Sequence, residues 1–200
     1  MVRGALIALA LGLAAGPAAA TQDAWPALHD VTGVASNDTL NVRADPSADA
    51  QIVGALPHDT RGVEVIRPDD QQGWGLVNLG EGTGWVSLRF LARRPGQWQG
   101  AFPPLAACFG TEPFWTLRLD GDAVTFATPE DEAAGTVTAR LGSSARRDRH
   151  GLRARIGERP LSSIVAARAC SDGMSDRAYG LAFDALLGDE VLSGCCTLAR

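Results

Sequence analysis

The chain has 200 residues and a formal charge of −5, and its residues are 46% hydrophobic, 20% charged and 6% aromatic. This composition excludes a disordered chain, which has fewer apolar residues and a larger net charge. All the basic residues are arginine. The mild acidity argues against a nucleic-acid-binding protein, because a negative chain repels phosphate.

The first twenty residues have the three parts of a secretory signal. Arg3 is positive, residues 5–15 form an apolar run, and three alanines end at Ala20, which predicts Thr21 as the first mature residue. The run is shorter than the roughly 20 apolar residues that cross a bilayer. No later run approaches that length, so we expect a periplasmic or secreted protein without a membrane span after cleavage near Ala20.

All four cysteines lie in the second half of the chain, at Cys108, Cys170, Cys195 and Cys196. An even number of cysteines in an oxidising compartment predicts two disulfides. The adjacent Cys195 and Cys196 would point to opposite faces of a strand, so each is expected to bridge to a distant cysteine. Which of them pairs with Cys108 and which with Cys170 stays open. The ligand spacing of a metal site is missing, and we expect neither a metal nor a cofactor.

Short alternating apolar patches separated by turns occupy residues 28–91. They predict strands at 40–43, 52–56, 63–66, 74–77 and 84–86, which is the pattern of a small β-barrel or sandwich. Gly54, Gly73 and Gly84 are expected to allow tight bends or a positive φ. The side chains expected to fill the barrel are Leu40, Val42, Ile52, Leu56, Val63, Val65 and Val86.

This first block resembles the bacterial SH3 domain, the Src-homology-3-like module of exported proteins. The matching elements are Leu-Asn-Val-Arg-Ala-x-Pro at 40–46, Ile-Val-Gly-x-Leu at 52–56, Val-x-Val at 63–65, Gly-Trp-x-x-Val at 73–77 and Gly-Trp-Val-x-x-x-Phe-Leu at 84–91. The resemblance covers about a third of the chain in order and spacing. It implies a barrel of five to six strands that binds peptidoglycan or peptide ligands and has no chemistry of its own.

A Pro/Gly-rich linker at residues 95–104 separates this domain, residues 24–94, from a second domain at 105–200. Strands are predicted there at 114–119, 123–126, 135–141, 152–156, 163–170, 181–187 and 191–198. Asp120-Gly121 between two alternating runs is a strong hairpin signal. We therefore expect an all-β protein, with a small SH3-like barrel followed by an antiparallel β-sheet or barrel domain that carries the disulfides.

The second domain resembles an uncharacterised family of bacterial exported proteins and lipoproteins. Its motifs are Cys-Phe-Gly-Thr-Glu-Pro-Phe-Trp at 108–115, Cys-Ser-Asp-Gly-Met-Ser-Asp-Arg at 170–177 and Gly-Cys-Cys at 194–196. Members often have Tyr-Pro after the second motif, whereas this chain has Tyr179-Gly180. The resemblance implies a small exported β-domain and no established chemistry.

Four residues of the first domain are candidate ligand contacts: Trp74, Trp85, Arg43 and Asn78. An exposed indole can stack on a sugar or a peptide, although we expect both indoles to pack at the end of the barrel, since large aromatic side chains are mostly buried. Arg43 is either a ligand contact or the partner of a nearby carboxylate, Asp45 or Asp49.

The second domain offers candidates in its two long motifs: Glu112, Trp115, Asp172, Asp176 and Arg177. They form either a ligand pocket or, as we favour, a polar network in which Asp172 and Asp176 cap turns and Glu112 pairs with Arg177. A hydrolase with paired carboxylates is the enzymatic alternative. A Cys–His hydrolase is disfavoured because the cysteines are expected to be oxidised and His150 lies in a string, 146–151, that is typical of a solvated loop.

Charge is unevenly distributed along the chain. Residues 140–168 contain eight arginines and two acids, a net +6, whereas residues 21–139 carry −9 and residues 169–200 carry −3. The segment 140–168 is therefore either a surface that docks an anion or a solvated loop and strand. Aromatic residues do not interleave with these arginines, so single-stranded nucleic acid is unsupported.

The sequence thus predicts a non-enzymatic exported protein of the bacterial cell envelope that binds peptidoglycan, a peptide ligand or an envelope protein. The alternatives are an envelope hydrolase or an inhibitor of a lytic enzyme, carried by the second domain, and a purely structural envelope protein.

Overall fold

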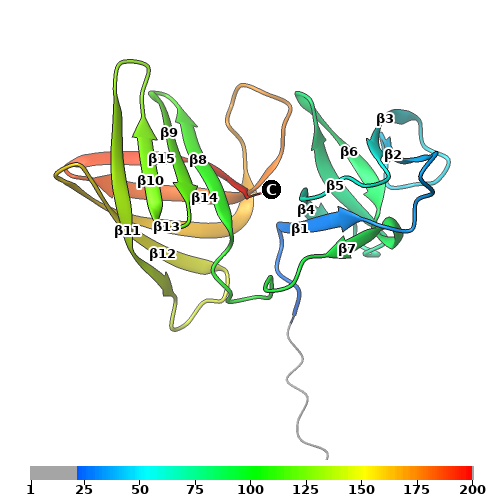
Figure 1. Ribbon diagram of the computed structural model, residues 1–200, viewed down its shortest axis with the longest axis horizontal. Coiled ribbons are helices and arrows are strands. Elements are labelled where there is room, and N and C mark those ends of the chain that lie inside the picture. Colours follow the sequence, from blue (N-terminus) through cyan, green and yellow to red (C-terminus); the bar gives the residue numbers. More distant parts are fainter. Residues whose placement is uncertain (1–21, 200) are drawn as a thin grey trace, which may run out of the picture.

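The computed structural model describes residues 22–199 and consists of two β domains side by side (Figure 1). One is an antiparallel sheet and the other a closed antiparallel barrel, so the expected all-β fold class is confirmed. The predicted signal segment lies outside the described residues. No helix in residues 22–199 is both long and apolar enough to cross a membrane.

Seven strands form the first sheet, in the order β3-β2-β6-β5-β4-β1-β7. The five expected strands are present, and β1 and β7 add two at one edge, so the sheet exceeds the five to six strands that the resemblance implied. A 3-10 turn, η1, at Leu88–Phe90 precedes β7. The strands are β1 (Ala27–Val31), β2 (Thr39–Arg43), β3 (Ile52–Pro57), β4 (Val63–Pro68), β5 (Trp74–Leu79), β6 (Gly82–Ser87) and β7 (Leu91–Arg93).

Alternate side chains of these strands build one apolar core. Its buried members are Val31, Leu40, Val42, Val63, Val65, Val77, Val86 and Leu91. Ile52 is an exception to the expected core, because it lies on the edge strand β3 and is 50% exposed. None of Gly54, Gly73 and Gly84 has the positive φ that was one alternative, but Gly73 lies in the expected bend, directly before β5. Gly54 and Gly84 are instead places of close approach, where a Cβ would collide with Leu79 and Val42 respectively.

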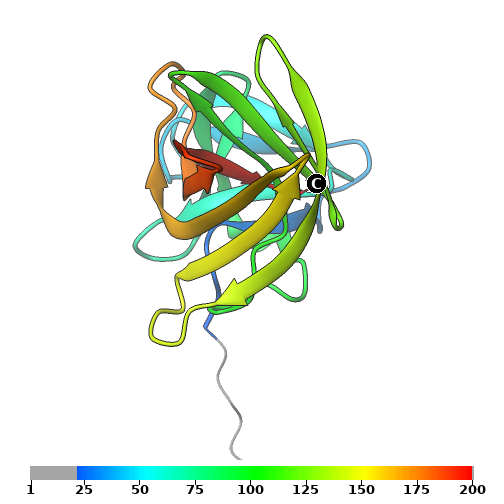
Figure 2. The same ribbon diagram turned by 90° about the vertical axis from the view of Figure 1, so that its left-hand side faces the viewer.

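Eight strands close the second domain into a barrel, in the order β10-β11-β12-β13-β14-β15-β8-β9. Figure 2 faces this barrel. The expected hairpin at Gly121 is present, a second hairpin joins β14 to β15 at Gly188, and both glycines have positive φ. The strands are β8 (Leu105–Thr111), β9 (Phe114–Asp120), β10 (Ala123–Ala127), β11 (Glu132–Gly142), β12 (Arg149–Ile156), β13 (Arg159–Cys170), β14 (Tyr179–Leu187) and β15 (Glu190–Leu198).

Two disulfides join strands of the barrel, Cys108–Cys196 and Cys170–Cys195. Cys196 belongs to the apolar core and lies opposite Cys108 on the neighbouring strand, while Cys195 is not part of that core cluster and bonds to the end of β13. The prediction that the adjacent cysteines bridge to separate distant partners is therefore confirmed. Two disulfides also indicate an oxidising, non-cytoplasmic location.

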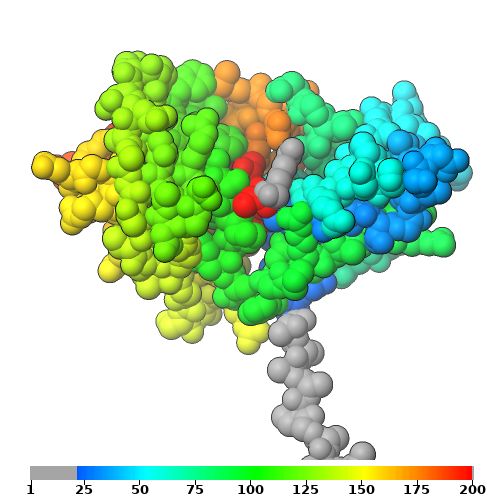
Figure 3. All heavy atoms as spheres, in the orientation of Figure 1, coloured from blue at the N-terminus to red at the C-terminus, as the bar shows by residue number. Residues whose placement is uncertain are grey.

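The two domains are in direct contact along a seam that contains the C-terminal strand, red in Figure 3. Leu28 of β1 packs into the apolar core of the barrel. The amide of Asn78 accepts from the Ala178 N–H at 3.0 Å and donates to its carbonyl at 2.9 Å. A carboxylate oxygen of Glu64 accepts from the Leu198 N–H at 3.3 Å. Because these bonds use backbone groups, they fix the position of one domain on the other.

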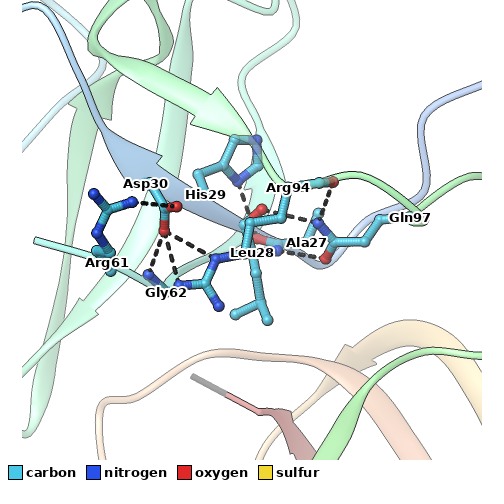
Figure 4. Close-up of polar contacts among 8 residues, drawn as sticks. All are labelled: Ala27, Leu28, His29, Asp30, Arg61, Gly62, Arg94 and Gln97. Carbon is cyan, nitrogen blue, oxygen red and sulfur yellow. Dashed lines mark hydrogen bonds and ion pairs between the residues drawn. The ribbon is translucent and has the colours of Figure 1, made fainter.

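The linker is held to the first domain by one buried side chain, Gln97 (Figure 4). Its Oε1 accepts from the Leu28 N–H at 2.7 Å, and its Nε2 donates to the carbonyls of Leu28 and Arg94, both at 2.9 Å. Nearby, the Asp30 carboxylate accepts from Arg61, Arg94 and the Gly62 N–H. The residues that we expected to form a linker are thus anchored to β1 of the first domain.

Replacing Gln97 by alanine is expected to lower the free energy of unfolding by about 2 kcal/mol, because the buried Leu28 N–H loses its partner. Urea denaturation of the full chain measures this change. Gln99→Ala, an exposed glutamine of the same linker, is the matched control and should change it by less than about 0.5 kcal/mol. Equal stability of the two variants would contradict the role assigned to Gln97.

Candidate functional site

An open groove of about 520 Å³ on the first domain contains two of the residues expected from the sequence, Arg43 and Trp74. Arg43 ends β2 and Trp74 begins β5, so the fold brings them together from 31 residues apart in the chain. Phe90 and Arg89 of the η1 turn and Asp38 complete the charged and aromatic part of the lining.

The indole of Trp74 is positioned by a turn centred on Asp69. One carboxylate oxygen of Asp69 accepts from the backbone N–H groups of Gly73 and Trp74, both at 2.8 Å. The bond from Trp74 is the largest cause of a lowered pKa for Asp69. Trp74 itself is half-buried and is not among the residues packed against the core of this domain, so the favoured packing in the core at the end of the barrel is not found. The backbone of Trp74 is thus fixed where the residue lines the groove.

Arg43 is pinned by the backbone and not by a carboxylate. Its Nη1 donates to the Ala50 carbonyl at 2.7 Å, across the turn that joins β2 to β3. The expected ion pair with Asp45 or Asp49 is absent from the ion pairs of residues 22–199. Arg89, the second cation of the groove, stacks on Phe90 at 5.5 Å. A guanidinium held by one bond keeps other N–H donors for an anionic group.

Two other residues singled out in the first domain lie outside the groove. Trp85 is half-buried on the opposite face of β6 from the core residues Gly84 and Val86, and the Arg67 guanidinium covers its ring at 4.9 Å. The favoured packing of Trp85 in the core at the end of the barrel is therefore not found either. Asn78 makes the inter-domain bonds described above, so its role as a ligand contact is replaced by a structural one.

In the second domain, Glu112 and Asp172 line one open cleft of about 550 Å³. The two motif loops are joined by the Thr111 hydroxyl, which donates to the Asp172 carbonyl at 2.8 Å, and both adjoin the Cys170–Cys195 disulfide. Met174, on the same cleft, is 69% exposed. The sequence expectation that the motifs come together holds for Glu112 and Asp172.

Asp172 is the centre of a turn network. Its carboxylate accepts from the N–H groups of Met174 and Ser175 at 3.0 Å and from the hydroxyls of Ser175 at 2.7 Å and Tyr179 at 3.2 Å. Partial burial alone would raise the pKa of Asp172, but these bonds outweigh it and lower the pKa to about 2. Asp172 is thus ionised at neutral pH and unsuited to the general acid of a hydrolase, which needs a raised pKa. The expected capping role is confirmed for this residue.

The remaining candidates of the second domain do not line that cleft. Trp115 is 4% exposed and packs in the barrel core near Phe126 and Phe183. Asp176 is exposed on the loop. Arg177 donates to the Gly80 carbonyl of the first domain at 3.3 Å, so the expected pairing with Glu112 is wrong. Asp172, Asp176 and Arg177 are neighbours in the sequence motif but do not share one surface. After Ser175 the loop turns toward the first domain.

The arginine-rich segment 140–168 is largely paired. Five of its eight arginines form ion pairs: Arg140, Arg146, Arg149, Arg159 and Arg168. The view of 146–151 as a solvated loop is wrong at its end, because His150 is 6% exposed and its side chain points inward from β12. Arg147, Arg153 and Arg155 have no ion pair within residues 22–199.

In the described part of the chain, no three His, Cys, Asp or Glu side chains gather in a way that would hold a metal ion. No family model, curated protein or solved structure matches the chain. The fold and its sites define a two-domain, disulfide-bonded all-β protein with open grooves on both domains. Sequence reasoning missed Phe90 and Arg89 as groove residues, although Phe90 stands in the last motif of the first block.

Proposed function

We propose that this is an exported binding protein of the bacterial cell envelope, and that its first domain is an SH3-type module that binds the peptide part of peptidoglycan. The observation that carries the proposal is the meeting of Trp74 and Arg43 in one open groove. Both are candidate ligand contacts in the sequence, where they belong to separate motifs. The export signal and the two disulfides fit a periplasmic or secreted protein.

The chemistry of the groove matches a short peptide that carries carboxylates. The indole of Trp74 combines a flat apolar ring with one N–H donor, so it can contact both the apolar and the polar parts of a ligand. Arg43 and Arg89 supply two cations beside it, and guanidinium groups bind carboxylates through paired N–H donors. Peptidoglycan stem peptides present small apolar side chains and free carboxylates, which these groups can contact together.

Replacing Trp74 by alanine is expected to weaken retention of the mature chain on purified peptidoglycan about tenfold, which corresponds to about 1.4 kcal/mol. Arg43→Ala should weaken it similarly and should also reduce its dependence on salt, since an ionic contact is lost. The measurement is a co-sedimentation isotherm at low salt, with circular dichroism to confirm that each variant folds.

Trp85→Ala is the matched control, because Trp85 is half-buried on the same sheet but lies outside the groove. Its affinity should stay within about twofold of the wild type. Failure of the wild-type chain to sediment with peptidoglycan would refute the proposed ligand, and equal losses for Trp74→Ala and Trp85→Ala would refute the proposed groove.

A further inference from the structure

A third cavity, of about 490 Å³, lies between the two domains. Three separate segments enclose it: residues 23–26 before β1, residues 97–104 of the linker, and the barrel residues 147–150 with Ala167 and Leu181. In Figure 1 the linker crosses from one domain to the other at the bottom of the view. No candidate contact from the two long motifs or from the first-domain groove lines this cavity.

Its walls are mainly aromatic and aliphatic. Trp98 is 47% exposed and has no ring partner among the described residues. Trp25, by contrast, is already covered, with Arg93 at 4.4 Å from its ring and His29 stacked at 5.6 Å. Phe102 makes an edge contact with His150 at 5.6 Å. Trp98 is therefore the indole that is free to cover an apolar ligand.

His150 supplies an unused polar group in this wall. The residue is 6% exposed, and its Nδ1 is buried without a hydrogen-bond partner in the described chain. Burial lowers the pKa of its imidazole, and the neighbouring Asp148 carboxylate only partly opposes this, so the ring is neutral at pH 7. A buried polar atom without a partner costs about 1–3 kcal/mol, and such atoms in native proteins call for a specific explanation.

Arg147 provides a charge at the rim of the cavity. The arginines on either side are engaged, since Arg146 and Arg149 both form ion pairs with Asp148, at 2.9 and 2.7 Å. Arg147 forms no ion pair and no hydrogen bond within residues 22–199, although it lines the cavity. Two carboxylates also line the cavity, and both are paired: Asp23 with Arg93, and Asp148 with its two arginines. Arg147 is therefore the lining charge that has no partner within residues 22–199, and a ligand of opposite sign would supply one.

We propose that the inter-domain cavity binds a small amphipathic carboxylate, with its apolar body against Trp98 and Phe102 and its carboxylate on the Arg147 guanidinium. The neutral His150 ring supports Phe102 in this wall. Predominantly apolar walls with a few directed polar groups are the usual make-up of small-molecule sites. Because the walls come from both domains and the linker, the bound ligand also ties the domains together. The proposal does not depend on the groove at Trp74.

Decanoate is the probe, and isothermal titration calorimetry on the mature chain is the measurement. We expect one decanoate per chain, and we expect decanol, which has the same chain length without the charge, to bind at least fivefold more weakly. Arg147→Ala should weaken decanoate about tenfold and abolish the difference between the two probes. Trp98→Ala should weaken both probes by a similar factor, since it removes the apolar wall.

Arg155→Ala is the matched control, because Arg155 is also exposed and without an ion pair but lies outside the cavity. It should leave decanoate affinity within about twofold of the wild type. The proposal is overturned by the absence of binding heat, by several decanoates per chain with no effect of Trp98→Ala, or by equal losses in Arg147→Ala and Arg155→Ala. Peptidoglycan retention should be unchanged in Arg147→Ala, which separates this site from the groove of the first domain.

Discussion

Replacing Cys108 and Cys196 together by alanine is expected to lower the free energy of unfolding by about 4–5 kcal/mol. This bridge spans 88 residues of sequence and ties the first strand of the barrel to the last. Without it the unfolded chain gains the entropy of a long open loop, and loss of the bridge from a loop of this length costs about that much. Both sulfurs lie in the apolar core, so their removal also leaves a small void.

Removal of the second disulfide is expected to cost less stability than removal of the first. Cys170–Cys195 closes only 25 residues, so Cys170→Ala with Cys195→Ala should cost about 3–4 kcal/mol. Urea denaturation at pH 7 measures both double variants against the wild type. Losses below about 1 kcal/mol for both would show that the bridges do not stabilise the barrel, and a larger loss for the shorter loop would contradict the loop-length argument.

Acidification from pH 6.5 to pH 4 is expected to remove about 3 kcal/mol of stability through His29. Burial is the largest cause that lowers the pKa of this imidazole to about 4, and the nearby Arg93 lowers it further; the bond to the Ala27 carbonyl and the carboxylates of Asp23 and Asp30 oppose the shift. The unfolded chain therefore binds a proton near pH 6.5, whereas the folded chain does so only near pH 4. The contribution of His29 to the free energy of unfolding is complete above pH 6.5, is lost between pH 6.5 and pH 4, and does not change further below pH 4. Each unit of pKa difference between the folded and unfolded chain corresponds to about 1.4 kcal/mol.

The His29→Gln variant isolates this effect, because its other titrating groups, His150 included, are unchanged. We expect the difference in unfolding free energy between wild type and variant to shrink or reverse as the pH falls from 6.5 to 4, whatever the cost of the substitution at pH 7. A difference that is constant across the interval would show that His29 titrates normally in the folded protein. Denaturation curves at four pH values are sufficient.

The strands that alternate apolar and polar residues were predictable from sequence, because one face of each is buried and the other is exposed to solvent. Leu40 and Val42 on β2, or Leu152, Ala154 and Ile156 on β12, show this period clearly. Three strands gave no such signal. Almost every residue of β1, Ala27–Val31, is buried, since the strand packs on both domains, and its His29 and Asp30 do not look like strand residues. β8, Leu105–Thr111, and the short β7, Leu91–Arg93, lack the alternation too.

The candidate sites were only partly predictable, because they depend on contacts between distant segments. Asn78 and Arg177 look like free polar residues in sequence, and only the docking of the domains assigns them to Ala178 and Gly80. The Pro/Gly-rich stretch was expected to be a plain linker, yet Trp98 and Phe102 make it a wall of a cavity. The burial of His150 was not predicted, because the charged residues before it are typical of an exposed loop.

We propose the groove with Trp74 and Arg43 as the ligand site of an envelope-binding protein. The most direct test is a nitrogen-15 NMR titration of the mature chain with soluble peptidoglycan fragments, read at the indole N–H signals of its five tryptophans. We expect the Trp74 signal to shift in a saturable way while those of Trp85 and Trp115 stay in place. Saturable binding that leaves the Trp74 signal unmoved, or no shift of any indole signal, would contradict it.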